Sequence, residues 1–382
     1  MTFLNNNTYA SNTWAVVSGQ SGKVLVWKSL PVNVSTSLIY PSGKDSVNLT
    51  IIEETTGSND KTYYTLSTFA NVATGSYSSP APFQYPPILG TCKVQNPSPT
   101  DYNTFQVSSE CGSTVSADHQ SEWQVSVCAN SSLFVQVQKT GLVPRYLYLP
   151  QISANGSVVI DQTKYNSLPE MKVNTVALGD TYSFTFFFLS VIKDSNSDWL
   201  YISSSSSDNA NSQPLYYPDQ VGSAFDEYYI TAAPNKPNVS FEFNSTVKDP
   251  SKYTIPTFTP TLDVVNSATI SHLDYNLSGN ADYVNTRFSG STSSLVSYWN
   301  IYNSFSKKTS LVLPIFPDDL KKEIDFSFIA ALQLQSISIG ETDLGGYKGF
   351  YTNNILGEKK RPKNSKYKKY TPKADGSIGG GG

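Results

Sequence analysis

Short runs of alternating apolar and polar residues dominate the chain. Most runs are rich in β-branched and aromatic side chains and end at clusters of Gly, Pro, Asn, Ser or Asp, which is typical of β-strands. Helical periodicity is confined to Pro317–Glu323, where proline and acidic residues open one or two helical turns. The pattern predicts an all-β protein of roughly seventeen strands, built as sandwiches or barrels.

Two long aromatic strands are predicted at comparable places in the two halves of the chain. Tyr182–Val191 follows a Leu-Pro step at Leu168-Pro169, and Ile324–Ile339 follows one at Leu313-Pro314. The offset of about 145 residues is too long for a solenoid and indicates duplication of a whole sandwich.

Two irregular stretches separate the predicted strands. Residues 73–100 hold six prolines and indicate a long loop with little strand pairing. Ser203–Ser207 has the composition of a surface linker near the middle of the chain. We therefore expect a first sandwich over residues 1–200, a second over residues 201–350, and a basic, glycine-ending tail over residues 351–382.

The composition is poor in charge. Only 15% of the 382 residues are charged, and hydroxyls and amides supply most of the polarity. The net charge of −3 is unevenly distributed, because residues 357–382 carry eight bases and two acids, a net of +6, which leaves −9 on the remainder. An acidic body with a basic end indicates an anionic partner for that end.

The basic end is the segment that most favours a partner. Its bases alternate with tyrosine and proline, so it has no apolar helical face. It could bind nucleic-acid phosphates, anionic lipid headgroups or an acidic groove of a neighbouring subunit, or serve as a disordered, solubilising tail. If this segment is an arm, deleting residues 358–382 is predicted to weaken assembly or vertex attachment and to leave thermal unfolding nearly unchanged. The candidate anchoring residues are Lys359, Lys360, Arg361, Lys363, Lys366, Lys368, Lys369 and Lys373.

The cysteines match no zinc or redox signature. Cys92, Cys111 and Cys128 are an odd number, at spacings of 19 and 17 residues. They are expected either to be three buried thiols or to include a single disulfide. The first residues lack the basic and apolar regions of a secretory signal, so we expect a chain made without one or already processed.

Eight Asn-x-Ser/Thr sequons occur in the sequence. They arise readily by chance in a chain rich in Asn, Ser and Thr, and they would also mark a surface glycoprotein. The candidate glycosylation sites are Asn6, Asn33, Asn48, Asn130, Asn155, Asn238, Asn244 and Asn276.

Catalytic and metal-binding patterns are weak. Neither His119 nor His272 has a second His or a Cys at a ligand spacing. The adjacent acids Glu53-Glu54 and Asp318-Asp319 do not form the opposed carboxylates of a glycosidase. No apolar run reaches the roughly 20 residues of a membrane-spanning helix. We therefore predict no enzyme activity, no cofactor, no metal and no small-molecule substrate.

The long aromatic strands Tyr182–Val191 and Ile324–Ile339 with their Leu-Pro steps, together with the basic Lys359–Lys373, give the chain a family resemblance. It resembles the double jelly-roll coat and vertex (turret) proteins of icosahedral viruses with an internal membrane. Its composition is similar to that of such viruses infecting thermoacidophilic archaea. The resemblance implies two eight-stranded jelly-roll sandwiches that assemble into pseudo-hexameric or five-fold rings, with the basic terminus directed toward membrane or genome.

The predicted function is that of a non-enzymatic virion structural protein, either a capsid shell subunit or a vertex turret subunit. Its expected partners are copies of itself, other capsid proteins, and inner membrane lipid or genome through the basic tail. A virus of a thermoacidophile is exposed to hot acid, in which carboxylates lose their charge near pH 4. A surface that is polar through hydroxyls and amides keeps its hydration there, so the composition supports this function. The alternatives are a secreted archaeal surface-layer or adhesion glycoprotein at the cell surface, and a carbohydrate-binding or carbohydrate-active β-sandwich.

Overall fold

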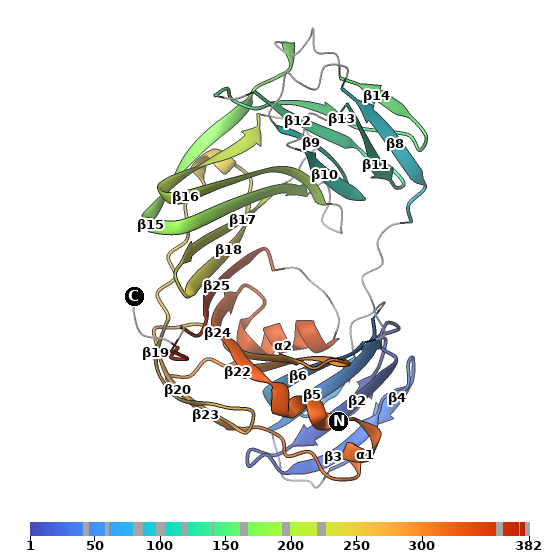
Figure 1. The fold of residues 1–382 in the computed structure, drawn as a ribbon, viewed down its shortest axis with the longest axis vertical. Helices are drawn as coiled ribbons and strands as arrows, with labels where there is room; N and C mark the ends of the chain where they lie inside the picture. Colours follow the sequence, from blue (N-terminus) through green and yellow to red (C-terminus); the bar gives the residue numbers. More distant parts are fainter. Residues whose placement is uncertain are drawn as a thin grey trace. The chain divides into compact units, whose positions relative to one another are not determined.

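A computed structural model describes residues 1–40, 46–57, 61–78, 87–96, 104–116, 121–139, 141–160, 167–192, 199–219, 227–356, 362–373 and 375–378. The chain forms two compact units. Unit 1 comprises Met1–Phe83, Pro237–Phe241 and Thr257–Gly382, and unit 2 comprises Gln84–Lys236 and Glu242–Pro256. Most strands of both units are labelled in Figure 1.

The main sheet of unit 1 has the strand order β25-β24-β21-β22-β6-β5-β2-β3. Neighbouring strands are antiparallel, except that β22 and β6 pair in parallel. The strands are β2 (Asn12–Ser18), β3 (Val24–Ser29), β5 (Ser46–Thr56), β6 (Thr62–Ala73), β21 (Tyr283–Ser291), β22 (Leu295–Ser304), β24 (Gln333–Thr342) and β25 (Asn364–Tyr370).

This sheet is buried on both faces. Every second residue of β22 is buried, whereas β2 is buried at consecutive positions. Trp14 and Val16 of β2 belong to one hydrophobic cluster, and Ala15 and Val17 belong to another. Because successive strand residues point to opposite faces, each face of the sheet has its own core.

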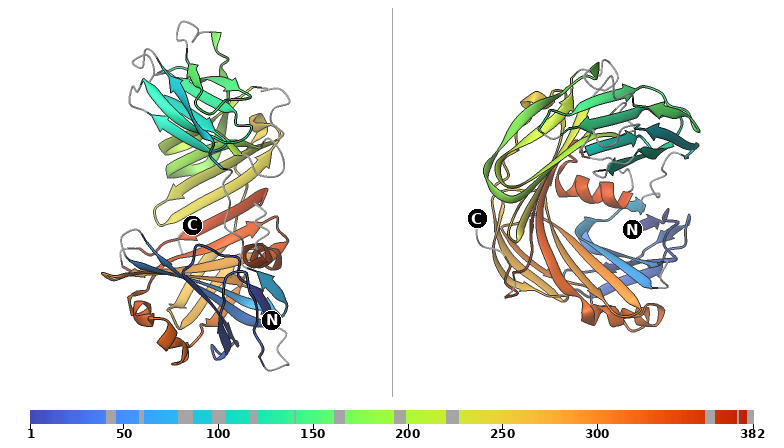
Figure 2. Two further views of the ribbon diagram at one scale, coloured as in Figure 1. Left: turned by 90° about the vertical axis from the view of Figure 1, so that its right-hand side faces the viewer. Right: turned by 45° about the horizontal axis from the view of Figure 1, so that its top comes forward.

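Small sheets and short helices contribute to these two cores. Leu273, Leu320 and Phe328 join the first core from β20, α1 and η5, and Phe3 and Tyr351 join the second from β1 and α2. Figure 2 shows α2 in red among the blue and orange strands. The elements are β19 (Thr261–Ala268), β20 (His272–Ser278) and β23 (Lys308–Val312) in one sheet; β1 (Thr2–Leu4), β4 (Ser35–Ser37) and β7 (Ser76–Ser78) in another; α1 (Leu320–Glu323), the 3-10 helix η5 (Phe326–Ala331) and α2 (Gly346–Leu356).

Unit 2 contains a small β-sandwich. One sheet has the order β10-β9-β12-β13 and the other has the order β11-β8-β14. Both sheets contribute to one core, in which the rings of Phe105 and Trp123 stack with centroids 4.1 Å apart. The strands are β8 (Gly90–Gln95), β9 (Thr104–Ser109), β10 (Gly112–Ser116), β11 (Glu122–Val127), β12 (Leu133–Gln138), β13 (Arg145–Leu149) and β14 (Ser157–Val159).

The rest of unit 2 is built on a long hairpin of β15 (Met171–Ile192) and β16 (Trp199–Pro218). The hairpin has a register shift between Ala177 and Tyr182. The second half of β15 also pairs with β17 (Glu227–Lys236). Next come β18 (Val239–Val247), whose first residues belong to unit 1, and the 3-10 helix η4 (Pro250–Lys252).

Serine hydroxyls join the two halves of β16. Ser203 Oγ donates to the carbonyl oxygen of Tyr216 at 2.7 Å, and Ser205 Oγ donates to that of Pro214 at 2.6 Å. The two halves therefore lie side by side and run in opposite directions, so β16 folds back on itself. The serine side chains are small enough to let the backbones approach, and their hydroxyls donate to carbonyl oxygens of the facing half.

The all-β class is confirmed, because strands make up most of the described residues and the helices are short. The prediction of a linker at Ser203–Ser207 was wrong. These residues lie within β16, where Ser203 and Ser205 form the contacts between its halves. Composition alone indicated a linker because a serine run has no apolar face.

The prediction of one strand over Ile324–Ile339 was wrong in its first half. Helix η5 occupies Phe326–Ala331, and β24 begins only at Gln333. The Asp325 side chain accepts a hydrogen bond from the Ser327 backbone N–H at 2.9 Å and so caps η5. The helical turn predicted within Pro317–Glu323 is confirmed as α1, which Asp319 caps.

The two units also differ from the predicted tandem division at residue 200. Residues 1–83 pack with residues 257–382, while residues 84–236 form most of unit 2. The parallel pairing of β22 with β6 brings these distant segments together, with Leu295 opposite Thr62 and Tyr302 opposite Phe69.

Candidate functional site

The predicted basic arm is partly built into unit 1. Six residues of β25 pair with β24, from Ser365 opposite Thr342 to Tyr370 opposite Ile337. The backbone N–H of Thr371, just beyond the strand, donates to the carbonyl oxygen of Asn238 at 3.0 Å. This part of the sequence is therefore a strand of the main sheet rather than an extended arm.

Two of the candidate anchoring lysines are engaged within the fold. Lys366 Nζ lies 3.0 Å from Glu341 Oε1, its cross-strand neighbour. Lys368 is only 8% exposed, and its Nζ donates to the carbonyl oxygen of Pro260 at 3.3 Å. The same Nζ lies 5.4 Å from the ring centroid of Phe241 and 5.3 Å from that of Tyr370, within cation–π range.

The other candidate lysines lie closer to solvent. Lys363 and Lys373 are exposed and Lys369 is half-buried. Lys359, Lys360 and Arg361 lie outside the described residues. The surface that remains for an anionic partner is therefore smaller than the sequence predicted, because Lys366 and Lys368 have structural roles.

The cysteines include one disulfide, which joins Cys111 to Cys128 with their Cα atoms 6.0 Å apart. Cys111 follows β9 and Cys128 follows β11, so the bond links the two sheets of the small sandwich. Cys92 is a free, buried thiol whose pKa is raised by burial. Of the two expectations left open by the sequence, the structure contains the single disulfide.

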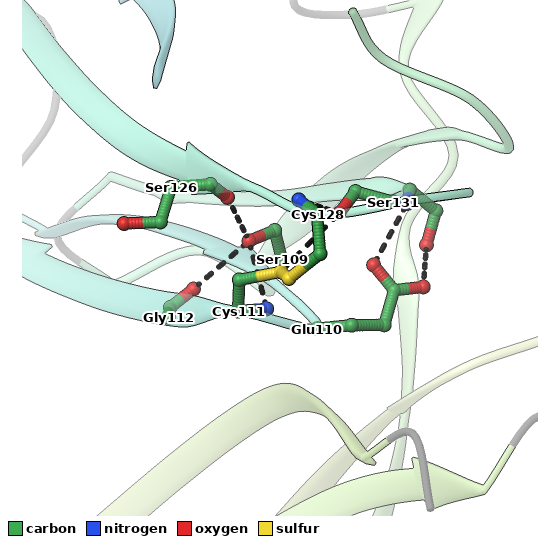
Figure 3. The surroundings of a disulfide bond; sticks show 8 residues. Ser109, Glu110, Cys111, Gly112, Ser126, Cys128 and Ser131 are labelled. Atoms are coloured by element: carbon green, nitrogen blue, oxygen red, sulfur yellow. Dashed lines mark hydrogen bonds between the residues drawn. A yellow bond between two sulfur atoms is a disulfide. The ribbon is translucent and has the colours of Figure 1, made fainter. Parts of the chain in front are cut away.

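Hydrogen bonds hold both ends of the disulfide, as Figure 3 shows. Ser131 Oγ accepts from the Cys128 N–H at 2.7 Å, and Ser109 Oγ accepts from the Cys111 N–H at 3.2 Å. The Glu110 carboxylate accepts from the backbone N–H and the hydroxyl of Ser132, at 2.7 and 2.6 Å. This network fixes the β9–β10 turn against the segment that follows β11.

The sequon asparagines divide by exposure. Asn33, Asn130, Asn155 and Asn238 are exposed and have φ of 59°, 60°, 61° and 61°. Asparagine tolerates this left-handed conformation better than most residues, so turn geometry accounts for their presence. These four residues are accessible to solvent, where a glycan could be attached.

The other four sequon asparagines are less accessible. Asn48 and Asn244 are only 1% and 9% exposed, and Asn6 and Asn276 are half-buried. Asn244 Oδ1 accepts from Thr231 Oγ1 at 2.6 Å, and its Nδ2 donates to Glu242 Oε1 at 2.7 Å. A glycan at either buried position would displace packed neighbours.

The described residues contain no cluster of three or more metal-ligating side chains. His272 contacts Ser310 Oγ at 3.3 Å, and His119 lies outside the described residues. The adjacent acids have structural partners: Glu53 accepts from Asn7 Nδ2 at 2.5 Å, and Asp319 accepts from Trp27 Nε1 at 3.1 Å. Burial raises the pKa of Glu53. No helix within the described ranges has the length and hydropathy needed to cross a membrane.

The sequence reasoning missed a half-open aromatic row on β15. Phe184 is 39% exposed and Phe186 and Phe188 are half-buried, whereas Phe187, between the last two, is fully buried. The sequence predicted a long aromatic strand over Tyr182–Val191 without an open face. The apolar residues of Tyr182–Val191 predicted a strand, but nothing in the sequence indicated which face of that strand would be exposed.

The chain matches no protein-family model and no curated protein. Among solved structures, it is similar to one titled "Ca2+-stabilized adhesin helps an Antarctic bacterium reach out and bind ice", with 10% identity, coverage of 90% of this chain and 93% of that chain, and a TM-score of 0.13. It is also similar to Escherichia coli alpha-2-macroglobulin activated by porcine elastase, with 10% identity, coverage of 87% and 39%, and a TM-score of 0.12. TM-scores this low do not establish a shared fold or function.

Proposed function

We propose that this chain is a non-enzymatic structural protein of a virion, a capsid shell or vertex turret subunit that assembles with copies of itself and other capsid proteins. The observation that carries the proposal is an all-β body in which threonine and serine hydroxyls form internal hydrogen bonds, at contacts where many proteins use ion pairs. Thr50 and Thr68 share a hydroxyl hydrogen bond of 2.8 Å across β5 and β6, and Ser203 and Ser205 join the halves of β16.

Such contacts suit a particle exposed to acid. Hydroxyl hydrogen bonds persist when carboxylates become protonated near pH 4, whereas ion pairs are lost. Only 15% of residues are charged, while cytosolic proteins of hyperthermophiles are enriched in charge. The proposed location is therefore the virion.

The disulfide is consistent with that location. Disulfides persist on virion and cell surfaces and in secreted proteins, and they also occur inside hyperthermophilic archaea. Cys111–Cys128 links the two sheets of a sandwich that has seven strands among the described residues. A cross-link of this kind stabilises a small core chiefly by restricting the unfolded chain.

The finer architecture proposed with this function is a double jelly roll, as the resemblance to viral coat and turret proteins implies. Support comes from two β-rich units that each have sandwiched sheets.

The anchoring role proposed for the basic end excludes the two lysines that are engaged within the fold, Lys366 and Lys368, which hold β25 in place. The remaining candidates, Lys359, Lys360, Arg361, Lys363, Lys369 and Lys373, would contact inner membrane lipid or genome phosphates. Lys363→Glu together with Lys373→Glu is expected to weaken co-sedimentation with phosphatidylglycerol vesicles or duplex DNA at low salt. Undiminished co-sedimentation of the double variant would refute the part of these two lysines in this role.

Self-assembly tests the main proposal. Light scattering of the purified protein over a hundredfold concentration range, followed by negative-stain microscopy, is expected to reveal closed rings or shells. A monomer at every concentration and at both neutral and acidic pH would refute the proposal.

A surface-layer or adhesion glycoprotein is the second candidate, and the four exposed turn asparagines favour it. For that function, mass spectrometry of protein from its natural source should find glycans on Asn33, Asn130, Asn155 or Asn238, and the protein should fractionate with the cell envelope. Recovery in purified virions without the envelope would separate the first candidate from the second.

A further inference from the structure

The aromatic row on β15 lies on a sheet face that is partly open to solvent. Phe184, Phe186 and Phe188 alternate with Thr185 and Phe187, which are 0% exposed on the opposite face. Phe184 is 39% exposed, and the ring centroids of Phe186 and Phe188 lie 6.5 Å apart. The three rings therefore form a line along one strand.

Small polar side chains flank this row on the β16 side. Ser204, Ser206 and Asp208 lie directly opposite Phe188, Phe186 and Phe184 in the β15–β16 register. Ser206 and Asp208 are exposed and Ser204 is half-buried. Side chains opposite one another in a sheet are about 5 Å apart, so these polar groups border the rings.

The β17 side has a similar border. Thr231, Ala233 and Asn235 lie opposite Phe188, Phe186 and Phe184, and all three are half-buried. Figure 1 shows β15 between β16 and β17. Apart from Ala233, the side chains that bound the aromatic row on both sides can donate or accept hydrogen bonds, which is the composition of a ligand site.

The charges of this face restrict the ligand. Asp208 is exposed on one border, and Glu242, which accepts from Asn244, is exposed beyond the other. Lys236, near one end of β17, lies over the Tyr182 ring with its Nζ 5.6 Å from the centroid. Carboxylates at both borders repel phosphates, sulfates and anionic lipid headgroups, so the charges exclude anionic ligands, and the aromatic rings with hydroxyl and amide groups beside them favour a neutral one.

The geometry points to a binding face for a neutral polysaccharide on β15, β16 and β17. The C–H face of a pyranose ring would rest on Phe184 and Phe186, and its hydroxyls would reach Ser206, Asp208 and Asn235. Hydroxyl-rich ligands require both donors and acceptors, which these side chains supply. This binding is separate from self-assembly and would give a virion surface protein a contact with host glycans.

Affinity electrophoresis of the full-length protein tests the proposal. Native gels would contain yeast mannan, laminarin or galactomannan as neutral probes, and dextran sulfate as an anionic probe. We expect at least one neutral probe to retard the protein and dextran sulfate not to. Phe184→Ala is expected to weaken retardation about tenfold, since an aromatic contact of this kind contributes roughly that factor.

Two further variants keep the test decisive. Ser206→Arg adds a bulky side chain beside the rings without removing packed atoms, and it should abolish retardation even if Phe184→Ala is unstable. Val173→Ala removes an exposed side chain from the other half of β15 and should leave binding unchanged.

The proposal is overturned if no neutral probe retards the wild-type protein, or if Ser206→Arg binds as well as wild type. A change of oligomeric state in Ser206→Arg without any glycan binding would assign this face to a contact between copies instead. Light scattering reports assembly independently, so loss of glycan binding with assembly intact refutes only the glycan proposal.

Discussion

Tyr370 is the residue whose replacement most clearly separates a packed strand from a free tail. Its side chain is 5% exposed and belongs to the first core of unit 1. Its hydroxyl oxygen accepts a hydrogen bond from the Leu262 N–H at 3.1 Å, which connects β25 to β19. Burial raises the pKa of this hydroxyl, as expected for a phenol enclosed in a core.

The expected losses follow from these contacts. Tyr370→Ala removes a buried ring and should lower the free energy of unfolding by about 4 kcal/mol. Tyr370→Phe keeps the ring but leaves the buried Leu262 N–H without its acceptor, which costs about 1–2 kcal/mol. Tyr9→Ala is the matched control, because Tyr9 is 73% exposed, and its effect should stay within about 0.5 kcal/mol.

Native-state hydrogen exchange with mass spectrometry measures the effect on β24 and β25 directly. A loss of about 4 kcal/mol corresponds to roughly a thousandfold faster exchange of their amides through local opening. If Tyr370→Ala exchanges no faster than Tyr9→Ala in these strands, β25 is a detached tail and the described packing is wrong. The earlier expectation that deleting residues 358–382 leaves unfolding unchanged is replaced by a loss at least as large as that of Tyr370→Ala.

Three other predictions concern stability. Replacing both Cys111 and Cys128 by Ser opens a loop with a sequence separation of 17 residues and should lower the free energy of unfolding by about 3 kcal/mol. Hydrogen exchange should become faster in β9–β12 and stay unchanged in β20–β23. Equal protection of β9–β12 in the variant and the wild type would contradict this. Burial raises the folded-state pKa of Glu53. The contribution of Glu53 to stability is therefore present below its unfolded-state pKa and is lost as pH rises through its folded-state pKa. Glu53→Gln should raise the melting temperature at pH 7 but not at pH 3, and parallel pH profiles of variant and wild type would refute the assignment. A Cβ on Gly340 would lie 2.2 Å from the Tyr283 ring, so Gly340→Ala should cost roughly 1–3 kcal/mol by displacing that ring, and an unchanged guanidinium midpoint would argue against the contact.

Strand content could be predicted because alternation is a local signal. In β22 every second residue from Leu295 onward is buried, and the sequence Leu295–Ile301 carried that pattern openly. The short helix α1 was equally predictable, because a proline and an aspartate shortly before Leu320 are typical of a helix start. These elements depend on neighbours within a few residues of each other.

The misread segments depend on distant partners. Ser203–Ser207 forms a strand because its hydroxyls meet carbonyls of the other half of β16, near Pro214 and Tyr216. Lys368 is buried because Phe241 and Pro260 happen to lie beside β25. Local composition indicates a linker and a tail in these places, since a serine run and a lysine-rich run each lack an apolar face.

The candidate sites were predictable only in part. The disulfide could be narrowed to three cysteines, but choosing Cys111–Cys128 required knowing that β9 and β11 lie in facing sheets. Sequons could be counted, yet only the turn conformation separates exposed Asn155 from buried Asn48. Exposure is a property of the packed chain, so sequence motifs alone could not rank these positions.

Electron cryo-microscopy of particles purified from the natural source tests the structural role most directly. The proposed function predicts density for both β-rich units of this chain, repeated in closed rings of the shell or at the vertices, with β25 paired in the sheet and not extended as a free arm. Particles whose shell and vertices are fully accounted for by other chains, with this protein absent, would contradict it.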